Sequence, residues 1–341
     1  MKKRRIYYQD PGQELQRQKE YWRNFVKRFL YRVFVLLIFI LFIYVYLTFK
    51  IEMSSSSQIQ ILLNIRLPRL ILAILTGAGL SLSGAVMQTL FRNPLADSYM
   101  LGISGGALFG VMLSKFIFGG NLIINVILSF VFSVLSFFLS LILSKSIKGD
   151  KRFTLVLSGL MLNIIFSSVV IVMSMLMRAD AKDMFYMLMG SLNIIILKRF
   201  IFFYIILALL LIFSFLFFFI KSKELDLLAF GDEIAISSGL EAKKSFYTMM
   251  LFSVLIVSIL VSFSGIIGFI GVLIPNMVRI SKQKHIKLLP ESIFYGAFAL
   301  TLSDFIAKNS MAFEMPVGVV TSIVGVPFLF IILSRSFNAK S

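Results

Sequence analysis

Side chains that could perform chemistry are scarce in this 341-residue chain. It has no cysteine and a single histidine, His285, in the basic stretch Ser281–Lys287. A structural or catalytic zinc site draws three or four ligands mainly from Cys and His, and a nucleophilic triad needs a histidine between an acid and a serine or cysteine. We interpret His285 as a solvated loop residue, and we predict no metal site, no cofactor and no catalytic residue.

A nucleotide-binding loop is also missing from the sequence. The phosphate loop of ATPases reads G-x-x-x-x-G-K-[ST], and this chain contains no Gly-Lys pair. The segment Ile103-Ser104-Gly105-Gly106 echoes the signature loop of ABC ATPases, but it stands at the head of an apolar run. Small residues there are better explained by close packing between helices. We therefore predict that the chain is not an enzyme.

The elements that must position the remaining polar groups are apolar helices. Hydrophobic residues make up 59% of the chain and charged residues only 15%, which excludes a disordered chain, a disulfide scaffold and most soluble enzymes. A membrane-spanning helix needs about 20 apolar residues. Uncharged runs of that order occupy 33–49, 70–91, 98–114, 122–144, 153–177, 200–220, 245–278 and 315–334.

Two further considerations bring the count of spans to ten. As one helix, the run 245–278 would extend about 51 Å, so we divide it into two spans at Gly265, Gly268 and Gly271. The shorter run 292–303 becomes a span if Asp304 and Lys308 lie near its far end. The predicted fold class is an all-α membrane protein, a polytopic bundle of about ten transmembrane helices.

The distribution of positive charge predicts the orientation. With the N-terminus in the cytoplasm, the cytoplasmic segments hold 25 of the 34 Lys and Arg residues, as the positive-inside rule requires. The net charge of +18 is then explained by topology and by contact with membrane lipid, so we predict no nucleic-acid partner. We expect a basic cytoplasmic lead-in at 1–32 before an uncleaved first span, a permease domain at 33–335 with a cytoplasmic segment at 221–244, and a cytoplasmic tail at 336–341.

Four ordered segments carry more specific information than the spans. The first runs from Arg66-Leu67-Pro68-Arg69 through Gln88 and Asn93-Pro94-Leu95-Ala96-Asp97 to Gly106. The second is Leu225–Leu240, a mixture of polar and apolar residues between two spans. The third joins the glycines of 265–271 to Pro275-Asn276-Met277-Val278-Arg279, and the fourth is Glu314-Met315-Pro316-Val317-Gly318 with the residues up to Pro327.

In this order the segments resemble the FecCD family of ABC-transporter permeases, over about Arg66 to Leu333. The resemblance implies a permease built like the vitamin B12 permease, importing iron–siderophore complexes, haem or vitamin B12 across the cytoplasmic (inner) membrane. It implies three kinds of partner: a second permease subunit in a homodimer or heterodimer, two cytoplasmic ABC ATPase subunits that hydrolyse ATP, and an extracytoplasmic substrate-binding protein.

The resemblance also assigns roles to residues. The segment Leu225–Leu240 is similar to the family's coupling helices, which fit a groove on the ATPase; a plain amphipathic surface helix is the alternative. The matching positions are Gly231, Asp232, Glu233, Ala235, Gly239 and Leu240.

Docking of the binding protein is assigned to Arg66 and Arg69, with Lys308 in place of a third family arginine. Lysine keeps the charge but loses the planar fork that grips a carboxylate. Anchoring of a helix end by snorkelling of the two arginines to the membrane interface is the alternative.

For the translocation path we predict Gln88, Asn93, Gly265 and Gly268. Structural hydrogen bonding by Gln88 and Asn93 is an equal alternative, because a polar residue in a span must find a partner. The sequence departs from the family's spelling at Ser98, at Met187, at Asn276 and at Phe313–Pro316, which makes substrate detail less transferable than fold.

The predicted function is the permease subunit of an ATP-driven importer of ferric siderophores, working by alternating access. Haem or cobalamin import by the same architecture is the first alternative. An ion-coupled secondary transporter is an alternative of a different class, and the nearly uncharged interior of the spans disfavours it. A non-transporting membrane scaffold or sensor is the third.

Overall fold

The computed structural model describes residues 26, 30, 33–50, 56–178, 181–192, 201–310 and 314–338. The predicted lead-in at 1–32 and the end of the predicted tail lie almost wholly outside these residues. The chain forms two compact units, Met1–Leu62 and Leu63–Ser341. The first contains the apolar helix Val33–Thr48 and the short helix α2, Ser56–Ile61; everything that follows concerns the second.

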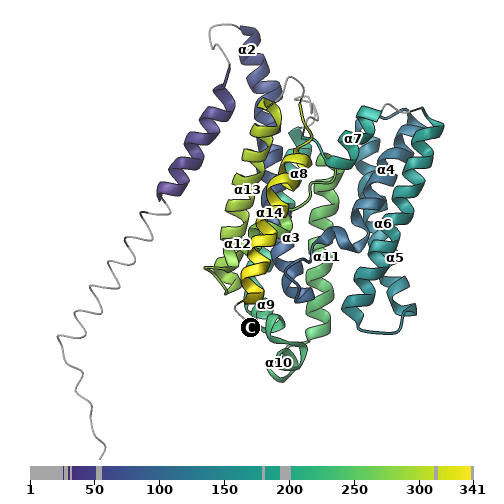
Figure 1. The fold of residues 1–341 in the computed structure, drawn as a ribbon, viewed down its shortest axis with the longest axis vertical. Coiled ribbons are helices and arrows are strands. Elements are labelled where there is room, and N and C mark those ends of the chain that lie inside the picture. Colours follow the sequence, from purple (N-terminus) through teal and green to yellow (C-terminus); the bar gives the residue numbers. More distant parts are fainter. Residues whose placement is uncertain are drawn as a thin grey trace, which may run out of the picture. The chain divides into compact units, whose positions relative to one another are not determined.

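Within the described residues of the second unit, the regular secondary structure is entirely helical (Figure 1). The unit begins one residue into the π-helical turn Leu62–Arg66 and continues as α3 (Leu67–Phe91), a 3-10 turn η2 (Ser98–Leu101), α4 (Ile103–Phe118), α5 (Leu122–Ser146), α6 (Lys151–Leu176), α7 (Ala181–Met189), α8 (Ile201–Ile220), α9 (Ser222–Phe230), α10 (Asp232–Ser237), α11 (Ala242–Ser264), α12 (Ile270–Arg279), α13 (His285–Asn309) and α14 (Val317–Asn338).

Local sequence signals explain where the helices begin and end. Pro68 stands in the first turn of α3, where its missing N–H costs nothing, and Arg92 ends that helix in the left-handed conformation. The Asp150 carboxylate accepts the backbone N–H groups of Arg152 and Phe153 at the start of α6. Within the described residues, five helical stretches are long and apolar enough to cross a membrane: Gln58–Phe91, α5, α6, α8 and α11. The prediction of an all-α membrane bundle is confirmed.

Helix α3 lies at the centre of the second unit. It packs against α11, α12 and α13, while α4, α5 and α6 pack together as a neighbouring group. Nearly all of α3 from Leu70 to Phe91 is buried, whereas α5, α6 and α8 leave most of their apolar surface exposed. Exposed apolar helix faces of this kind are stable only in lipid.

Glycines set how closely these helices approach. A Cβ atom on Gly77 would lie 2.3 Å from the carbonyl oxygen of Gly296, and one on Gly84 would lie 1.8 Å from that of Gly271. Both distances are shorter than any real contact, so only glycine allows α3 to meet α13 and α12 at these points. The close packing expected at Gly105 and Gly106 is confirmed, because a Cβ atom on Gly106 would lie 2.4 Å from the carbonyl oxygen of Phe132.

The run 245–278 is interrupted where the glycines predicted, but its second half is not a full span. Helix α11 ends at Ser264, Gly265 takes a φ of +67°, and α12 starts only at Ile270. The ten residues of α12 extend about 15 Å, half a hydrocarbon core. The expectation of a second complete helix was therefore wrong. The residues 265–269 between the two helices are not helical, and Ile267 among them is fully buried. Non-helical backbone is tolerated at membrane depth where it packs against protein or lines a cavity.

Candidate functional site

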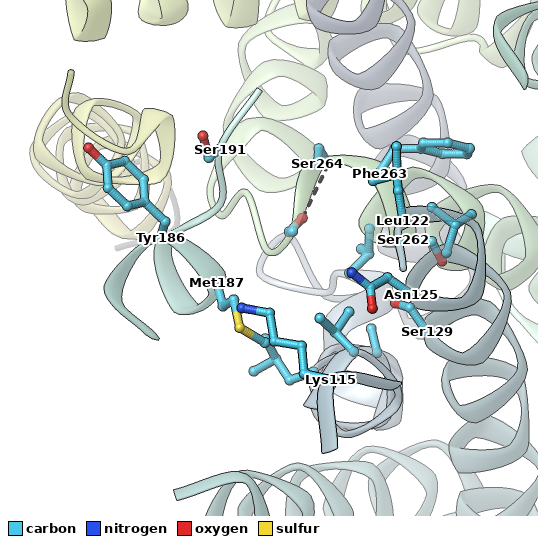
Figure 2. Close-up of a pocket in the computed structure, with 16 residues that line it drawn as sticks. Lys115, Leu122, Asn125, Ser129, Tyr186, Met187, Ser191, Ser262, Phe263 and Ser264 are labelled. Carbon is cyan, nitrogen blue, oxygen red and sulfur yellow. Dashed lines mark hydrogen bonds between the residues drawn. The ribbon is translucent and has the colours of Figure 1, made fainter. Parts of the chain in front are cut away.

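A half-open pocket of about 410 Å³ lies beside the end of α11 (Figure 2). Its walls are the residues of α4 from Ala107 to Lys115, the first turns of α5, α7 with Ser191, and the residues Val261–Gly265. Because α7 lies at the end of the bundle opposite α9 and α10 (Figure 1), the pocket belongs to that end. Gly265 is the one predicted path residue that lines it.

The predicted docking residues lie at the same end, and Arg69 is deeply buried there. The Arg69 side chain is 4% exposed, and its Nε and Nη2 atoms donate to the Asp304 carboxylate at 3.0 and 2.9 Å. Its Nη1 atom donates to the Glu314 carboxylate at 2.8 Å. This cluster joins α3 to α13 and to the segment before α14. Arg66 and Lys308 are only partly buried, so they offer more surface than Arg69 does.

A hydrogen-bond chain connects this cluster to the pocket. The Tyr186 hydroxyl, whose ring lines the pocket, donates to the backbone carbonyl of Glu314. The Glu314 carboxylate in turn holds Arg69. A displacement of Glu314 would therefore change its contacts both with Arg69 of α3 and with Tyr186 of α7.

At the opposite end, the segment of 221–244 forms α9 and α10 (Figure 1). Leu225, Leu228 and Ala235 point into the core, and Leu240 packs against it. Gly231 and Gly239 join the helices with φ values of +141° and +82°, which side chains with a Cβ rarely adopt. Three large apolar side chains face outward from these helices and were missed in the sequence: Phe230, Ile234 and Ile236, which are 73%, 48% and 62% exposed.

Asp232 anchors α10 to the membrane-spanning helices. Its carboxylate accepts from Arg92 at the end of α3 at 2.6 Å and from Arg152 at the start of α6 at 2.7 Å. Arg92 also donates to the Leu228 carbonyl of α9 at 3.1 Å. One carboxylate thus ties the segment to two helices.

His285 makes a second link, and our interpretation of it as a solvated loop residue was wrong. It is 1% exposed and begins α13. Its backbone N–H and its Nδ1 atom contact the Asp226 carboxylate of α9 at 3.0 and 2.6 Å, and its Nε2 atom lies 2.7 Å from the Thr89 hydroxyl of α3. Arg279 donates to the same hydroxyl at 2.7 Å. The sequence interpretation failed because the neighbouring lysines are typical of a solvent-exposed loop.

The other predicted path residues have structural contacts. The Gln88 amide nitrogen donates to the Val272 carbonyl of α12 at 2.9 Å. Asn93 is exposed, and its side chain accepts the Leu95 N–H in the turn after α3. A side chain on Gly268 would meet no atom within 4 Å. These three residues do not line the pocket that contains Gly265.

Comparison with known proteins shows the family to which this chain belongs. The sequence profile of the FecCD transport family matches residues 30–335. The chain belongs to the FecCD transport family. It is thus the permease subunit of a FecCD-type ABC importer, a multi-pass membrane protein.

Relatives of this FecCD permease share most of its length. It is 37% identical over 279 residues to a probable iron chelatin transport system permease protein of Helicobacter pylori, covering 81% of this chain and 83% of the relative. It is 33% identical to the hemin transport system permease protein HmuU of Yersinia pestis, covering 82% and 84%. A solved structure described as an inward-facing metal-chelate type ABC transporter matches with a TM-score of 0.75 and 25% identity, covering 88% of this chain and 99% of that one.

Two residues at which this FecCD permease departs from the family spelling have clear contacts. The Ser98 hydroxyl lies 2.6 Å from the Ser83 hydroxyl of α3. The Asn276 amide nitrogen donates to the Pro94 carbonyl at 2.7 Å and thereby ties α12 to the turn after α3. Met187 lines the pocket. Ser98 and Asn276 thus contact residues of other segments, and Met187 forms part of the cavity wall.

Proposed function

We propose that this FecCD permease imports ferric siderophores by alternating access, driven by two separate ABC ATPase subunits. The single observation that carries the coupling part is the apolar surface formed by Phe230, Ile234 and Ile236 on a segment fixed to three membrane helices. Outward apolar side chains on an otherwise polar segment are typical of a protein interface. The iron chelate is favoured as substrate by the iron chelatin permease among the relatives.

In this mechanism the contacts of α9 and α10 convert a movement of the ATPase into a movement of helices. Asp232 would carry a displacement to α3 and α6 through Arg92 and Arg152, and Asp226 would carry it to α13 and α3 through His285. Small displacements of packed helices switch between discrete arrangements because the interior is close-packed. The residues that bear the coupling are Gly231, Asp232, Glu233, Ala235, Gly239 and Leu240.

Docking of the substrate-binding protein is proposed at the other end, through Arg66, Arg69 and Lys308. Arg66 and Lys308 would meet carboxylates of the binding protein directly. Arg69 would support the docking surface without contacting the binding protein, because its guanidinium is buried and paired with Asp304 and Glu314. The second permease subunit, homologous or identical, would complete the path. Both termini are proposed to lie in the cytoplasm.

Uptake of radiolabelled iron as a ferric siderophore, by cells with and without the gene, tests the proposal. We expect uptake to fall on deletion and to stop on ATP depletion while the ion gradient is maintained. Loss of haemin uptake with unchanged siderophore uptake would leave the architecture and overturn the substrate. Uptake that survives ATP depletion and collapses with the gradient would favour the secondary transporter instead.

A further inference from the structure

The pocket at the end of α11 contains polar groups that the fold does not use. The Ser129 side chain is completely buried, and within the described residues its hydroxyl has no hydrogen-bond partner. The Asn125 side-chain oxygen, one helical turn away on α5, is buried and without a partner in the same sense. A buried polar atom without a hydrogen-bond partner destabilises the folded state. Two such atoms on one wall of a cavity therefore point to a ligand that completes them.

The charge of the pocket restricts the class of ligand. Lys115 is the charged side chain among the described residues that line it, and none of those residues is acidic. Figure 2 shows Lys115 with Asn125 and Met187 around the cavity. A bare metal cation would be repelled by the ammonium group and would find no carboxylate, imidazole or thiolate ligand. A neutral or anionic solute with exposed oxygen atoms would accept hydrogen bonds from Ser129 and Lys115.

The size and connections of the pocket fit a solute in transit. Its volume of about 410 Å³ lies in the range of small-molecule sites. Val126, Leu108 and Val261 supply apolar wall, while Tyr186 links the pocket to Glu314 and hence to Arg69. Hydrogen bonds through Tyr186 and Glu314 therefore connect the pocket to the proposed docking residue Arg69.

We propose that this pocket is a binding site for the transported metal chelate, which it holds by the chelator's oxygen atoms rather than by the metal. Ser129 and Lys115 donate hydrogen bonds to those oxygens, and Lys115 adds a preference for anionic chelates. This inference rests on the proposed import function and specifies the substrate class of the permease itself.

The first test measures uptake by the complete transporter in proteoliposomes, with iron supplied as ferrichrome, a neutral hydroxamate, and as ferric enterobactin, an anionic catecholate. Ser129→Ala should raise KM about 3- to 10-fold, the loss of one hydrogen bond, with kcat nearly unchanged. Lys115→Gln should raise KM more for the anionic chelate than for the neutral one, and Lys115→Arg should restore it. Ser114→Ala is the matched control, because Ser114 is also buried, also has an unpartnered hydroxyl within the described residues, and does not line the pocket.

The second test measures occupancy directly, using the absence of cysteine from the natural chain. In the transporter in nanodiscs, a thiol reagent should label Leu122→Cys, which lines the pocket, and Ile123→Cys, which is exposed on the same helix outside it. The transported chelate should slow labelling of Leu122→Cys several-fold and leave Ile123→Cys unchanged.

The outcomes separate the two proposals. If the wild type transports a chelate but Ser129→Ala and Lys115→Gln match it, or if the chelate protects neither cysteine, the pocket is not the site and the import function stands. If the wild type transports neither chelate, the proposed function fails first and the pocket's substrate class fails with it.

Discussion

At the scale of single residues, the one histidine is the least expected feature. An ionised carboxylate only accepts hydrogen bonds, so the Nδ1 atom of His285 carries the proton shared with Asp226. The Nε2 atom is then left for the Thr89 hydroxyl. His285 is therefore a positioning residue between the segment proposed to meet the ATPase and the central helix.

We predict that His285→Ala lowers substrate stimulation of ATP hydrolysis several-fold while basal hydrolysis continues, because the Thr89 link is lost. His285→Asn should keep the contact to Asp226 and His285→Gln the contact to Thr89, so neither should restore full stimulation. ATP hydrolysis and uptake are measured together in proteoliposomes. Ser303→Ala is the control, since its hydroxyl only bonds within α13. Normal uptake per ATP in His285→Ala would contradict this role.

The buried charge cluster gives a second prediction at this scale. Asp304→Ala would leave the Arg69 guanidinium buried with half its partners, at a cost of about 3–5 kcal/mol of stability. The midpoint of thermal unfolding in detergent should fall clearly. Arg69→Met combined with Asp304→Leu should recover part of the loss, because apolar residues replace both charges. Glu241→Ala, which breaks the exposed pair with Lys244, should change the midpoint little; an equal fall in both variants would argue against the cluster.

At the scale of elements, α9 and α10 combine a buried face with an outward apolar face. Leu225, Leu228 and Ala235 fix the pair to the bundle, while Phe230, Ile234 and Ile236 remain available to a partner. Such a division is expected when a short amphipathic segment must transmit force rather than merely cover the bundle. The helices are too short to be stable alone, so their position depends on the Asp232 and Asp226 contacts.

We predict that Ile234→Asp with Ile236→Asp prevents stable association with the ATPase, because the apolar contact area would carry two charges. Co-purification of the ATPase with the permease from membranes measures this, and the amount of permease in the membrane should stay near that of the wild type. Ser146→Asp, an exposed change at the end of α5, should leave association intact. Retention of the ATPase by the double variant would refute the interface.

At the scale of the whole molecule, the two ends of the bundle carry different machinery. The end with α9 and α10 carries Asp232, Asp226 and His285, and the opposite end carries the pocket and the Arg69 cluster. The ten-residue helix α12 packs against α3, α13 and α14. Transport requires the two ends to face opposite sides of the membrane.

This arrangement predicts labelling from one side only. A membrane-impermeant thiol reagent added outside intact cells should label Asn121→Cys, in the turn between α4 and α5, and should spare Ser237→Cys in α10 until the membrane is opened; both positions are exposed. The cysteine-free parent chain serves as the blank. Labelling in the reverse pattern would place the termini outside the cell.

The sequence alone determined the membrane bundle, the family and most helix positions, because apolar length, charge distribution and ordered motifs are local properties of the chain. It also located the break in 245–278, since the closely spaced Gly265, Gly268 and Gly271 weaken a helix. It did not predict that α12 has only ten residues, because that depends on how the non-helical residues 265–269 pack against other segments.

Only the tertiary structure decided which polar residues meet. Asp304 binds Arg69, which lies 235 positions earlier in the chain. His285 looked solvated among lysines, but Asp226 and Thr89 bury it. The pocket combines Lys115 of α4, Ser129 of α5 and Gly265, which follows α11. Contacts between distant segments depend on how the helices cross, and no spacing within a single segment records that geometry.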